Sequence, residues 1–186
     1  MGLGAIGMIA LNILKKNSIG KLIAVDLNVS RLKLAKKLGA EIILNSSKKN
    51  PIEKYRTKED KIGLDVVFDF SGSVSGLNNA ISLSKYNGKV IAGSMYEDAN
   101  SSLKLGKEFH WNNIKIISSR AVNEPYCDYP SWNKKRLNEL ALKIINSKKY
   151  QFKSIINKKF LFKDAIKLYK KNIKDNKMLK LTFIHK

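Results

Sequence analysis

Cysteine and histidine are scarce in this chain of 186 residues, which has one of the former and two of the latter. A single thiol, Cys127, rules out an internal disulfide and fits a reducing compartment. Cys127, His110 and His185 show no metal-ligand spacing, and a zinc site needs several ligands that converge on one point. The sequence therefore predicts no metal site within this chain.

Long apolar runs are also missing. The longest candidate, Leu3–Leu14, is too short to cross a bilayer, and it lacks the positively charged residues that precede the core of a signal peptide. Lys15 and Lys16 follow it instead. We therefore expect a soluble, cytoplasmic protein with no membrane partner.

Acidic residues are few, because 15 Asp and Glu stand against 36 Lys and Arg, which gives a formal net charge of +21. Such a charge suggests a nucleic-acid or anionic surface as one interpretation. The lysines, however, occur as pairs spread along the whole chain, with no basic tail and no nucleic-acid-binding motif. Lys, Asn and Ile share A/T-rich codons, so genome composition also explains the excess. We expect no specific nucleic-acid partner.

The most informative feature that is present is the glycine pattern Gly2-Leu3-Gly4-Ala5-Ile6-Gly7. Such a turn normally follows a buried strand and opens a helix whose N-terminus receives a dinucleotide pyrophosphate. The helix follows over residues 5–16, where apolar residues recur at helical spacing. Only Met1 stands before the turn, so we expect the first strand to be largely missing.

Further along, short apolar runs alternate with helical patterns, which indicates an α/β fold with a doubly wound parallel sheet. In the strand order 3-2-1-4-5-6 the first strand is central, so its loss would leave two inner strand edges unpaired. A weakly patterned loop or frayed helix is expected over 45–62, a turn at Asn87-Gly88, and a helix after 131 capped by Ser131. The expected strands are 21–25, 41–44, 64–70, 89–93, 114–117, a loose region at 152–162, and 178–184. The other expected helices are 30–38, closed by Gly39, then 74–85 and 163–171.

Asp26 ends the strand that follows the first helix, 19 residues after Gly7. A carboxylate at that place can accept hydrogen bonds from the adenosine ribose hydroxyls. It also repels a 2′-phosphate, which favours NAD over NADP. Arg31 and Lys33 argue the other way, since a nearby cation could accept that phosphate.

Together these segments resemble the cofactor domain of the zinc-type medium-chain dehydrogenases/reductases, the relatives of alcohol, sorbitol and threonine dehydrogenases. The resemblance rests on the glycine turn, on Ala24–Asn28, and on Leu38–Glu41. It extends through Asp65–Asp69 with Ser71-Gly72, Asn87–Val90 with Gly93, and Phe109–Ser119, and so covers nearly the whole chain. It implies an oxidoreductase that transfers hydride between an alcohol or polyol and a nicotinamide cofactor.

The resemblance also implies where the cofactor binds. The glycine turn (Gly2, Gly4, Ala5, Ile6 and Gly7) would hold the pyrophosphate and Asp26 the adenosine ribose, and Arg31 would bind the cofactor as the cation that could accept a 2′-phosphate. Ser71 and Gly72, and Gly93 and Ser94, lie in turns that border the ribose and nicotinamide in the family, and Ser119 follows the next strand. No catalytic residue is assigned in this chain.

In this family the cofactor domain is inserted in a catalytic domain. The resemblance therefore implies a nucleotide-binding domain over 1–148 and a return segment of the catalytic domain over 149–186. The zinc ligands would belong to an N-terminal part that this chain lacks, so the chain would be a fragment and inactive alone. The aromatic loop Tyr126–Trp132 could face a substrate or a second copy. The alternatives are a separately encoded N-terminal half that assembles with this chain, and a complete, non-catalytic NAD-binding or interaction module.

Overall fold

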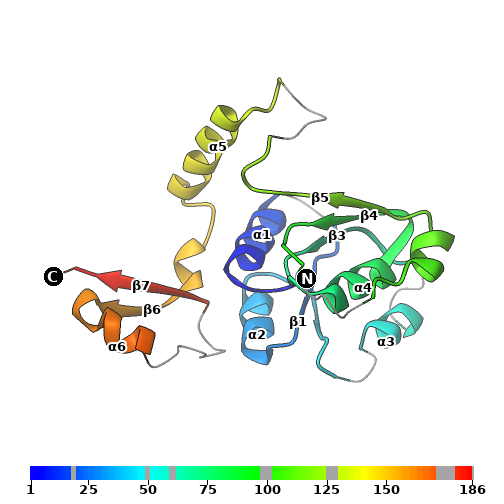
Figure 1. Cartoon of the computed structure of the whole chain (residues 1–186), viewed down its shortest axis with the longest axis horizontal. Helices are drawn as coiled ribbons and strands as arrows, with labels where there is room; N and C mark the ends of the chain where they lie inside the picture. Colours follow the sequence, from blue (N-terminus) through cyan, green and yellow to red (C-terminus); the bar gives the residue numbers. More distant parts are fainter. Residues whose placement is uncertain are drawn as a thin grey trace.

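In a computed structural model, residues 1–17, 20–48, 51–58, 62–96, 102–124, 130–170 and 179–185 are described (Figure 1). Helices and strands alternate through most of the chain. In chain order the elements are α1 (Ala5–Lys16), β1 (Ile23–Asp26), α2 (Val29–Lys37), β2 (Ile42–Asn45), α3 (Pro51–Lys58), β3 (Leu64–Asp69), α4 (Val74–Leu83), β4 (Ser84–Ala92), the π-helical turn η1 (Leu105–Phe109), β5 (Lys115–Ser118), α5 (Lys134–Asn146), η3 (Phe152–Ile155), β6 (Ile156–Leu161), η4 (Phe162–Asp164), α6 (Ala165–Lys170) and β7 (Lys180–Ile184).

All strand pairs among the described residues are parallel. β1 pairs with β2, and β4 lies between β3 and β5. A separate two-stranded sheet joins β6 to β7. This arrangement confirms the predicted parallel α/β fold.

The helices cover both faces of the main strands. The neighbouring residues Ala24 and Val25 in β1 are each 2% exposed and point to opposite faces, as successive strand residues do. Ala24 packs in a cluster with residues of α1 and α2, whereas Val25 packs in a cluster with residues of α3 and α4. The sheet is therefore doubly wound, as predicted.

The main sheet is divided between β1 and β3, which do not pair with each other. Met1 and Gly2 lie between them: Gly2 N–H donates to the Val25 carbonyl over 3.0 Å, and Phe70 N–H donates to the Met1 carbonyl over 2.9 Å. The Met1 amine donates to the Phe68 carbonyl. The predicted separation of β1 from β3 is confirmed, and the hydrogen bonds of Met1 and Gly2 connect the two strands at one point.

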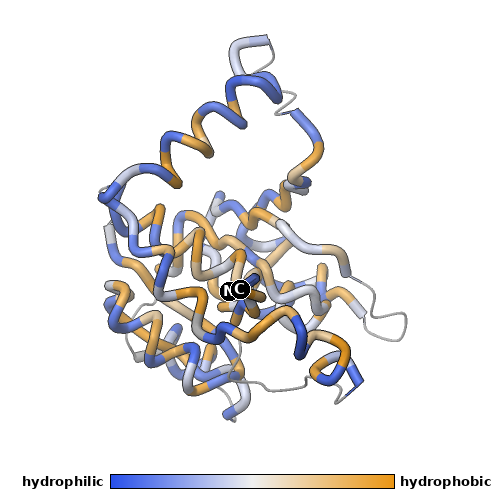
Figure 2. Tube along the Cα trace, turned by 90° about the vertical axis from the view of Figure 1, so that its left-hand side faces the viewer, coloured by the Kyte–Doolittle hydropathy of each residue, from blue (hydrophilic) through white to orange (hydrophobic). Residues whose placement is uncertain are grey.

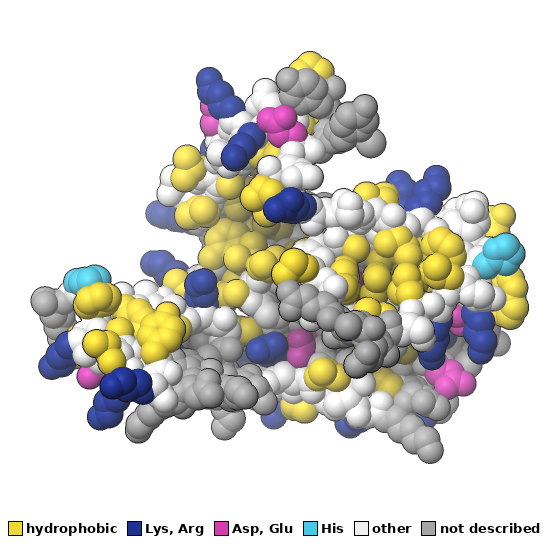
Figure 3. Space-filling view, in the orientation of Figure 1, with side chains coloured by type: hydrophobic (Ala, Val, Ile, Leu, Met, Phe, Trp, Pro, Cys, Tyr) yellow, Lys and Arg dark blue, Asp and Glu magenta, His cyan; other side chains and the backbone are white. Residues whose placement is uncertain are grey.

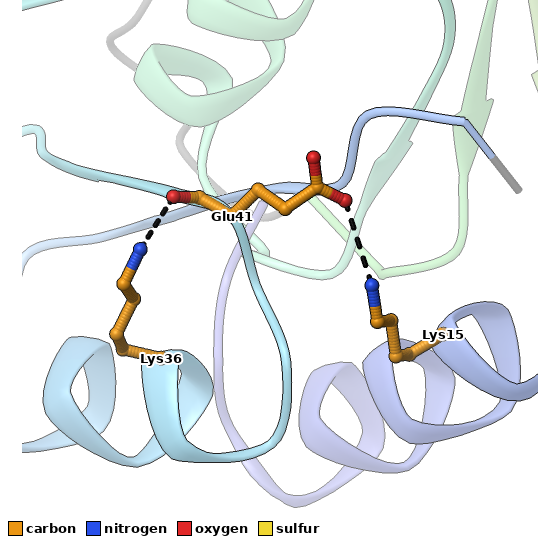
Figure 4. Close-up of polar contacts among 3 residues, drawn as sticks. All are labelled: Lys15, Lys36 and Glu41. Carbon is orange, nitrogen blue, oxygen red and sulfur yellow. Dashed lines mark hydrogen bonds and ion pairs between the residues drawn. The ribbon is translucent and has the colours of Figure 1, made fainter.

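The connection from α2 to β2 is held by the C-terminal lysines of two helices (Figure 4). Lys36 Nζ donates to the Glu41 carbonyl over 2.6 Å, and Lys15 Nζ lies 3.5 Å from Glu41 Oε1. Gly39 adopts a φ of +105°, and a Cβ there would lie 2.9 Å from the Lys15 side chain. The predicted helix closure at Gly39 is confirmed.

Two local predictions need correction, and of the loop or frayed helix expected over 45–62 the structure shows a helix. The Asn133 side chain, rather than that of Ser131, caps α5 by accepting from Arg136 N–H over 3.0 Å. Asn87 has the left-handed φ of 56° expected of a turn, yet it lies inside β4, whose pairing with β3 shifts register nearby. The region 45–62 contains an eight-residue helix, α3, whose residues Ile52 and Tyr55 are buried.

The C-terminal part forms a small sheet of its own, and Ile155 of η3 is buried in the cluster that contains Ala24 and residues of α1 and α2. α5 projects from the body in Figure 1, and none of its described residues is buried. Hydrophilic and hydrophobic residues alternate along it (Figure 2), and hydrophobic side chains gather beneath it in Figure 3. Cys127, most of the predicted aromatic loop and Met178 lie outside the described residues. No helix in the described ranges combines the length and apolarity needed to cross a bilayer.

Candidate functional site

The glycine turn lies where the carboxyl ends of β1 and β3 meet the N-terminus of α1. Gly2 has a φ of +75°, and a Cβ there would lie 2.5 Å from the backbone of Phe70 and Ser71. The short distance to this backbone and the positive φ angle both require glycine at position 2. The turn is thus folded tightly against the chain that leaves β3.

Gly4 and Gly7 have different surroundings. A Cβ on Gly7 would lie 1.9 Å from the Gly2 carbonyl oxygen, so Gly7 lets the helix approach its own turn. Around Gly4 no described heavy atom comes within 4 Å of such a Cβ. Gly4 also serves as the N-cap of α1 without a side-chain hydrogen bond, and the first turn of α1 carries no acidic residue. The helix N-terminus is therefore open to an anion.

Asp26 connects the end of β1 to the glycine turn. One carboxylate oxygen, Oδ2, accepts from Leu3 N–H over 2.6 Å, and Oδ1 accepts from Asn28 N–H over 2.7 Å. The residue is 8% exposed. Each carboxylate oxygen has a second lone pair, so Asp26 can hold the turn and still accept from a ligand hydroxyl.

A second turn follows β3 and faces the first. Asp69 is fully buried, and its Oδ1 accepts from Ser71 N–H over 3.0 Å while its Oδ2 accepts from the Tyr96 hydroxyl over 2.9 Å. Burial raises the pKa of Tyr96, and the hydrogen bond and charge of Asp69 raise it further. Asp69 thereby links the turn after β3 to the chain after β4.

The charges of two buried carboxylates also act on the amine of Met1. Burial lowers the pKa of this amine, and the charges of Asp69 and Asp26 oppose that shift.

A cavity of about 700 Å³ opens between the two turns. Five predicted site residues line it: Gly2, Gly4, Asp26, Arg31 and Ser71. The Nε of Arg31 is buried with no hydrogen-bond partner among the described residues, so a polar donor at the cavity is left unsatisfied.

The other predicted site residues do not line this cavity. They are Ala5, Ile6, Gly7, Gly72, Gly93, Ser94 and Ser119. Ile6 is 64% exposed on α1, and Gly72 has a φ of +70° beside the cavity wall at Ser71. The last three follow the carboxyl ends of β4 and β5, where Ser119 N–H donates to the Ala92 carbonyl over 2.9 Å.

Several residues that line the cavity were not predicted from the sequence: Asn28, Ser46, Ser73, Ser75 and Asn79. The sequence positions of two of them, Ser73 and Ser46, could have indicated their place at the cavity. Ser73 stands three residues before Gly76, whose N–H it accepts over 3.0 Å as the N-cap of α4. Ser46 directly follows β2, at the strand end where ligands bind in open α/β sheets.

The described residues were also compared with the requirements of a metal site. Across the described parts of the chain, no three His, Cys, Asp or Glu side chains come together in a group that could hold a metal ion. The described residues at this cavity, namely the glycine turn, the open helix N-terminus and Asp26, fit a dinucleotide.

The family model described as zinc-binding dehydrogenase matches residues 5–136. D-guloside 3-dehydrogenase from Escherichia coli K12 is 34% identical over 145 residues, which are 78% of this chain and 41% of that protein. The chain thus spans about two fifths of the length of this curated relative.

Solved structures agree in fold. L-idonate 5-dehydrogenase from Escherichia coli K-12 superposes with a TM-score of 0.77 at 16% identity, covering 98% of this chain and 48% of the other. An alcohol dehydrogenase from Escherichia coli CFT073, complexed with NADH, gives a TM-score of 0.73 at 20% identity, covering 97% and 49%.

Proposed function

Because the chain belongs to the zinc-binding dehydrogenase family, we propose that it is the nicotinamide-dinucleotide-binding part of an oxidoreductase. The enzyme would transfer hydride between an alcohol or polyol substrate and the cofactor, with NAD preferred to NADP. The observation that carries this proposal is the cavity between the two turns, which joins an open helix N-terminus to the carboxylate of Asp26.

The pyrophosphate would bind at the start of α1. The first backbone N–H groups of a helix have no partner within it, and the helix dipole favours a negative charge there. Gly4 leaves room for close approach, because the space where its Cβ would stand is empty of described atoms. A phosphate group can therefore reach the backbone directly.

The adenosine ribose would bind at Asp26. Its carboxylate is fixed by Leu3 and Asn28, so it is oriented before any ligand arrives. A fixed negative charge accepts hydrogen bonds from two ribose hydroxyls and repels a 2′-phosphate. Arg31, which lines the same cavity, is the residue that would favour NADP.

The nicotinamide supplies the hydride acceptor when the cofactor is bound. Ser71, Gly72, Gly93, Ser94 and Ser119 follow the carboxyl ends of β3, β4 and β5, on the side of the sheet where cofactors bind in this fold. We assign these residues to the nicotinamide end, and we assign no proton-transfer or metal step to this chain.

The division of the chain supports the same proposal. We place the nucleotide-binding domain at 1–148 and a segment of the substrate domain at 149–186. β6 and β7 form their own sheet, and the second segment meets the first where Gln151 N–H donates to Asn12 Oδ1 over 3.4 Å.

The proposal is tested by titrating the protein with NADH and following the fluorescence of the nicotinamide. Gly4→Val should abolish the enhancement, because its side chain fills the space needed by the pyrophosphate. Gly106→Val is the matched control, since a Cβ there also meets no described atom and Gly106 lies in η1, away from the cavity. Equal NADH binding by both variants, with unchanged circular dichroism, would refute the assignment.

A parallel titration with NADPH tests the cofactor preference. The unmodified chain should bind NADH more tightly than NADPH. Arg31→Ala should weaken NADPH binding further while changing NADH binding little. Tighter binding of NADPH by the unmodified chain would reverse the proposed preference.

A further inference from the structure

Asp69 connects the turn after β3 to the segment at 93–96, which follows β4. Its Oδ1 accepts from Ser71 N–H over 3.0 Å, whereas its Oδ2 accepts from the Tyr96 hydroxyl over 2.9 Å. Its backbone carbonyl accepts from Gly93 N–H over 2.9 Å. Asp69 therefore bonds to both ends of the segment at 93–96 and also to its own turn.

Glycines let these two pieces of chain approach each other closely. A Cβ on Gly93 would lie 2.4 Å from the ring of Phe70, so the ring occupies the space that a side chain would need. Conversely, a Cβ on Gly72 would lie 3.5 Å from the Met95 carbonyl oxygen. The turn after β3 and the segment after β4 thus each present a glycine to the other.

The ring of Tyr96 anchors the far end of the segment. It is half-buried and packs against the core cluster that contains Leu77 and Ile81 of α4. Its hydroxyl reaches the carboxylate of Asp69, which is fully buried. A hydrogen bond to a carboxylate is stronger than one between neutral groups, and a buried charge that loses its donor is destabilised. The bond therefore stabilises one position of the segment.

The segment at 93–96 lies next to the cavity that contains Asp26. Phe70 and Ser71 line that cavity, whereas the residues of the segment do not. In an open α/β sheet a dinucleotide lies across the carboxyl ends of the strands, at the point where the strand order reverses. With the adenosine at Asp26 on the β1 side, the nicotinamide lies toward the ends of β4 and β5. The segment is therefore placed at the nicotinamide end.

On the basis of the proposed cofactor role, we propose that the hydrogen bond between Asp69 and Tyr96 fixes the segment at 93–96 as a wall of the nicotinamide subsite. Asp69 is inaccessible to a ligand, and the Tyr96 hydroxyl already donates to it. Both are therefore positioning residues, which act on the cofactor through the backbone of the segment.

A preformed wall binds a ligand with a smaller loss of conformational entropy than a mobile one. Without the bond, the backbone hydrogen bond of Gly93 still holds the first residue of the segment, whereas the last residue loses its connection to the buried carboxylate. The nicotinamide half of the cofactor must then order the segment as it binds. The adenosine half, at Asp26, binds as before.

The test compares NADH with ADP-ribose, which has the same adenosine and pyrophosphate but no nicotinamide. Calorimetry on the full chain measures both affinities. Tyr96→Phe keeps the ring and removes the hydroxyl, so we expect NADH binding to weaken about tenfold and ADP-ribose binding to change by less than about twofold. Tyr86→Phe is the matched control, since Tyr86 is 64% exposed, and it should change neither affinity.

The fluorescence of bound NADH gives a second signal, because it reports on the surroundings of the nicotinamide. In Tyr96→Phe the emission should move toward that of free NADH. A double-mutant cycle then shows whether one bond is responsible. Adding Asp69→Asn to Tyr96→Phe should weaken NADH binding no further than the more damaging single change. Losses of NADH affinity that multiply in the double variant would contradict the shared role.

If Tyr96→Phe or Asp69→Asn does not fold, Gly93→Ala tests the other end of the segment. Its Cβ would move the segment away from the Phe70 ring and remove neither side-chain bond of Asp69. NADH binding should again weaken about tenfold, with ADP-ribose binding preserved. Gly106→Ala is the control, because no described atom lies within 4 Å of a Cβ there.

The outcomes separate this proposal from the proposed cofactor role. Equal loss of NADH and ADP-ribose binding in Tyr96→Phe, or no loss of either, would overturn the positioning role. Equal affinity of the unmodified chain for NADH and ADP-ribose would also overturn it, while leaving Asp26 and the glycine turn as the adenosine and pyrophosphate site. A chain that binds neither ligand would refute the cofactor role itself, and this proposal with it.

Discussion

The carboxylate of Asp26 holds the backbone N–H of Leu3 at 2.6 Å, so the acidic end of β1 is tied directly to the glycine turn. A residue expected to contact a ligand thus also builds the site that receives it. Because its other oxygen accepts from Asn28, loss of the carboxylate affects two buried or half-buried donors at once.

The first prediction follows from this double role. Asp26→Ala should weaken NADH binding and also lower the free energy of unfolding by about 1–3 kcal/mol for the donors left unpaired. Asp26→Asn, which keeps one acceptor oxygen, should lose less stability. Urea denaturation and NADH titration separate the two effects, and an Asp26→Ala variant with unchanged stability would contradict the structural role.

A second prediction concerns Gly7. A Cβ at this position would meet the Gly2 carbonyl at 1.9 Å, so Gly7→Ala must displace the turn. We expect a loss of about 2 kcal/mol or more in unfolding free energy, together with loss of NADH binding. Gly4→Ala is the comparison, because no described atom opposes its Cβ and stability should be preserved. If Gly7→Ala and Gly4→Ala gave identical urea denaturation curves, the close contact between Gly7 and the Gly2 carbonyl would be contradicted.

The third prediction is a dependence on pH at Tyr96. Its pKa is raised above the usual value of 10.0 by burial and by Asp69, so the folded state favours the neutral phenol. The stability from this group is therefore present below about pH 10 and lost as the pH rises through the higher folded pKa. Tyr96→Phe removes the bond to Asp69 and should cost about 1.5–3 kcal/mol at neutral pH.

The difference in unfolding free energy between the chain and Tyr96→Phe should stay constant from about pH 6 to 9 and shrink above about pH 10. Tyr86→Phe is the control, since Tyr86 is 64% exposed. A difference that vanished already at neutral pH would mean that Tyr96 does not depend on Asp69.

A fourth prediction concerns the chain alone. It should retain no stoichiometric zinc after chelation and should not reduce NAD with any alcohol or polyol, because no metal-binding group occurs among its described residues. Metal analysis and an absorbance assay for NADH measure both. Zinc retained at one equivalent, or alcohol-dependent NADH formation, would place catalytic groups in this chain.

The fifth prediction uses the charge of +21. The chain should bind any polyanion at low ionic strength, and binding should collapse near physiological salt as counterions cease to drive it. Heparin and DNA of several sequences should behave alike in salt titrations. A complex with one DNA sequence that survives high salt would instead indicate specific recognition.

Much of the fold could be predicted because helix periodicity and buried apolar strands are local signals. The helix at 5–16 agrees to the residue with α1, and β3 begins at Leu64 as expected. The cap of α5 could not be fixed in the same way, because Ser131 and Asn133 are both good capping residues and only the backbone decides between them.

The candidate site was predictable where one short segment determines the geometry. The glycine turn and Asp26 are of this kind. Ser75 and Asn79 reach the cavity only because α4 packs beside β3, and such long-range packing leaves no trace in the local pattern. The close contact between Gly7 and the carbonyl of Gly2 likewise depends on how the turn folds back onto the helix.

The division of the main sheet has one more consequence. The cofactor cavity takes Asp26 and Ser46 from the part that holds β1 and β2, and Ser71 and Ser73 from the part that holds β3 to β5. A ligand that fills this cavity contacts both sheets, which are otherwise connected here only through the hydrogen bonds of Met1 and Gly2. The contacts that bind the ligand then also hold the two sheets together. Ligand binding should therefore make the two sheets unfold in one cooperative transition.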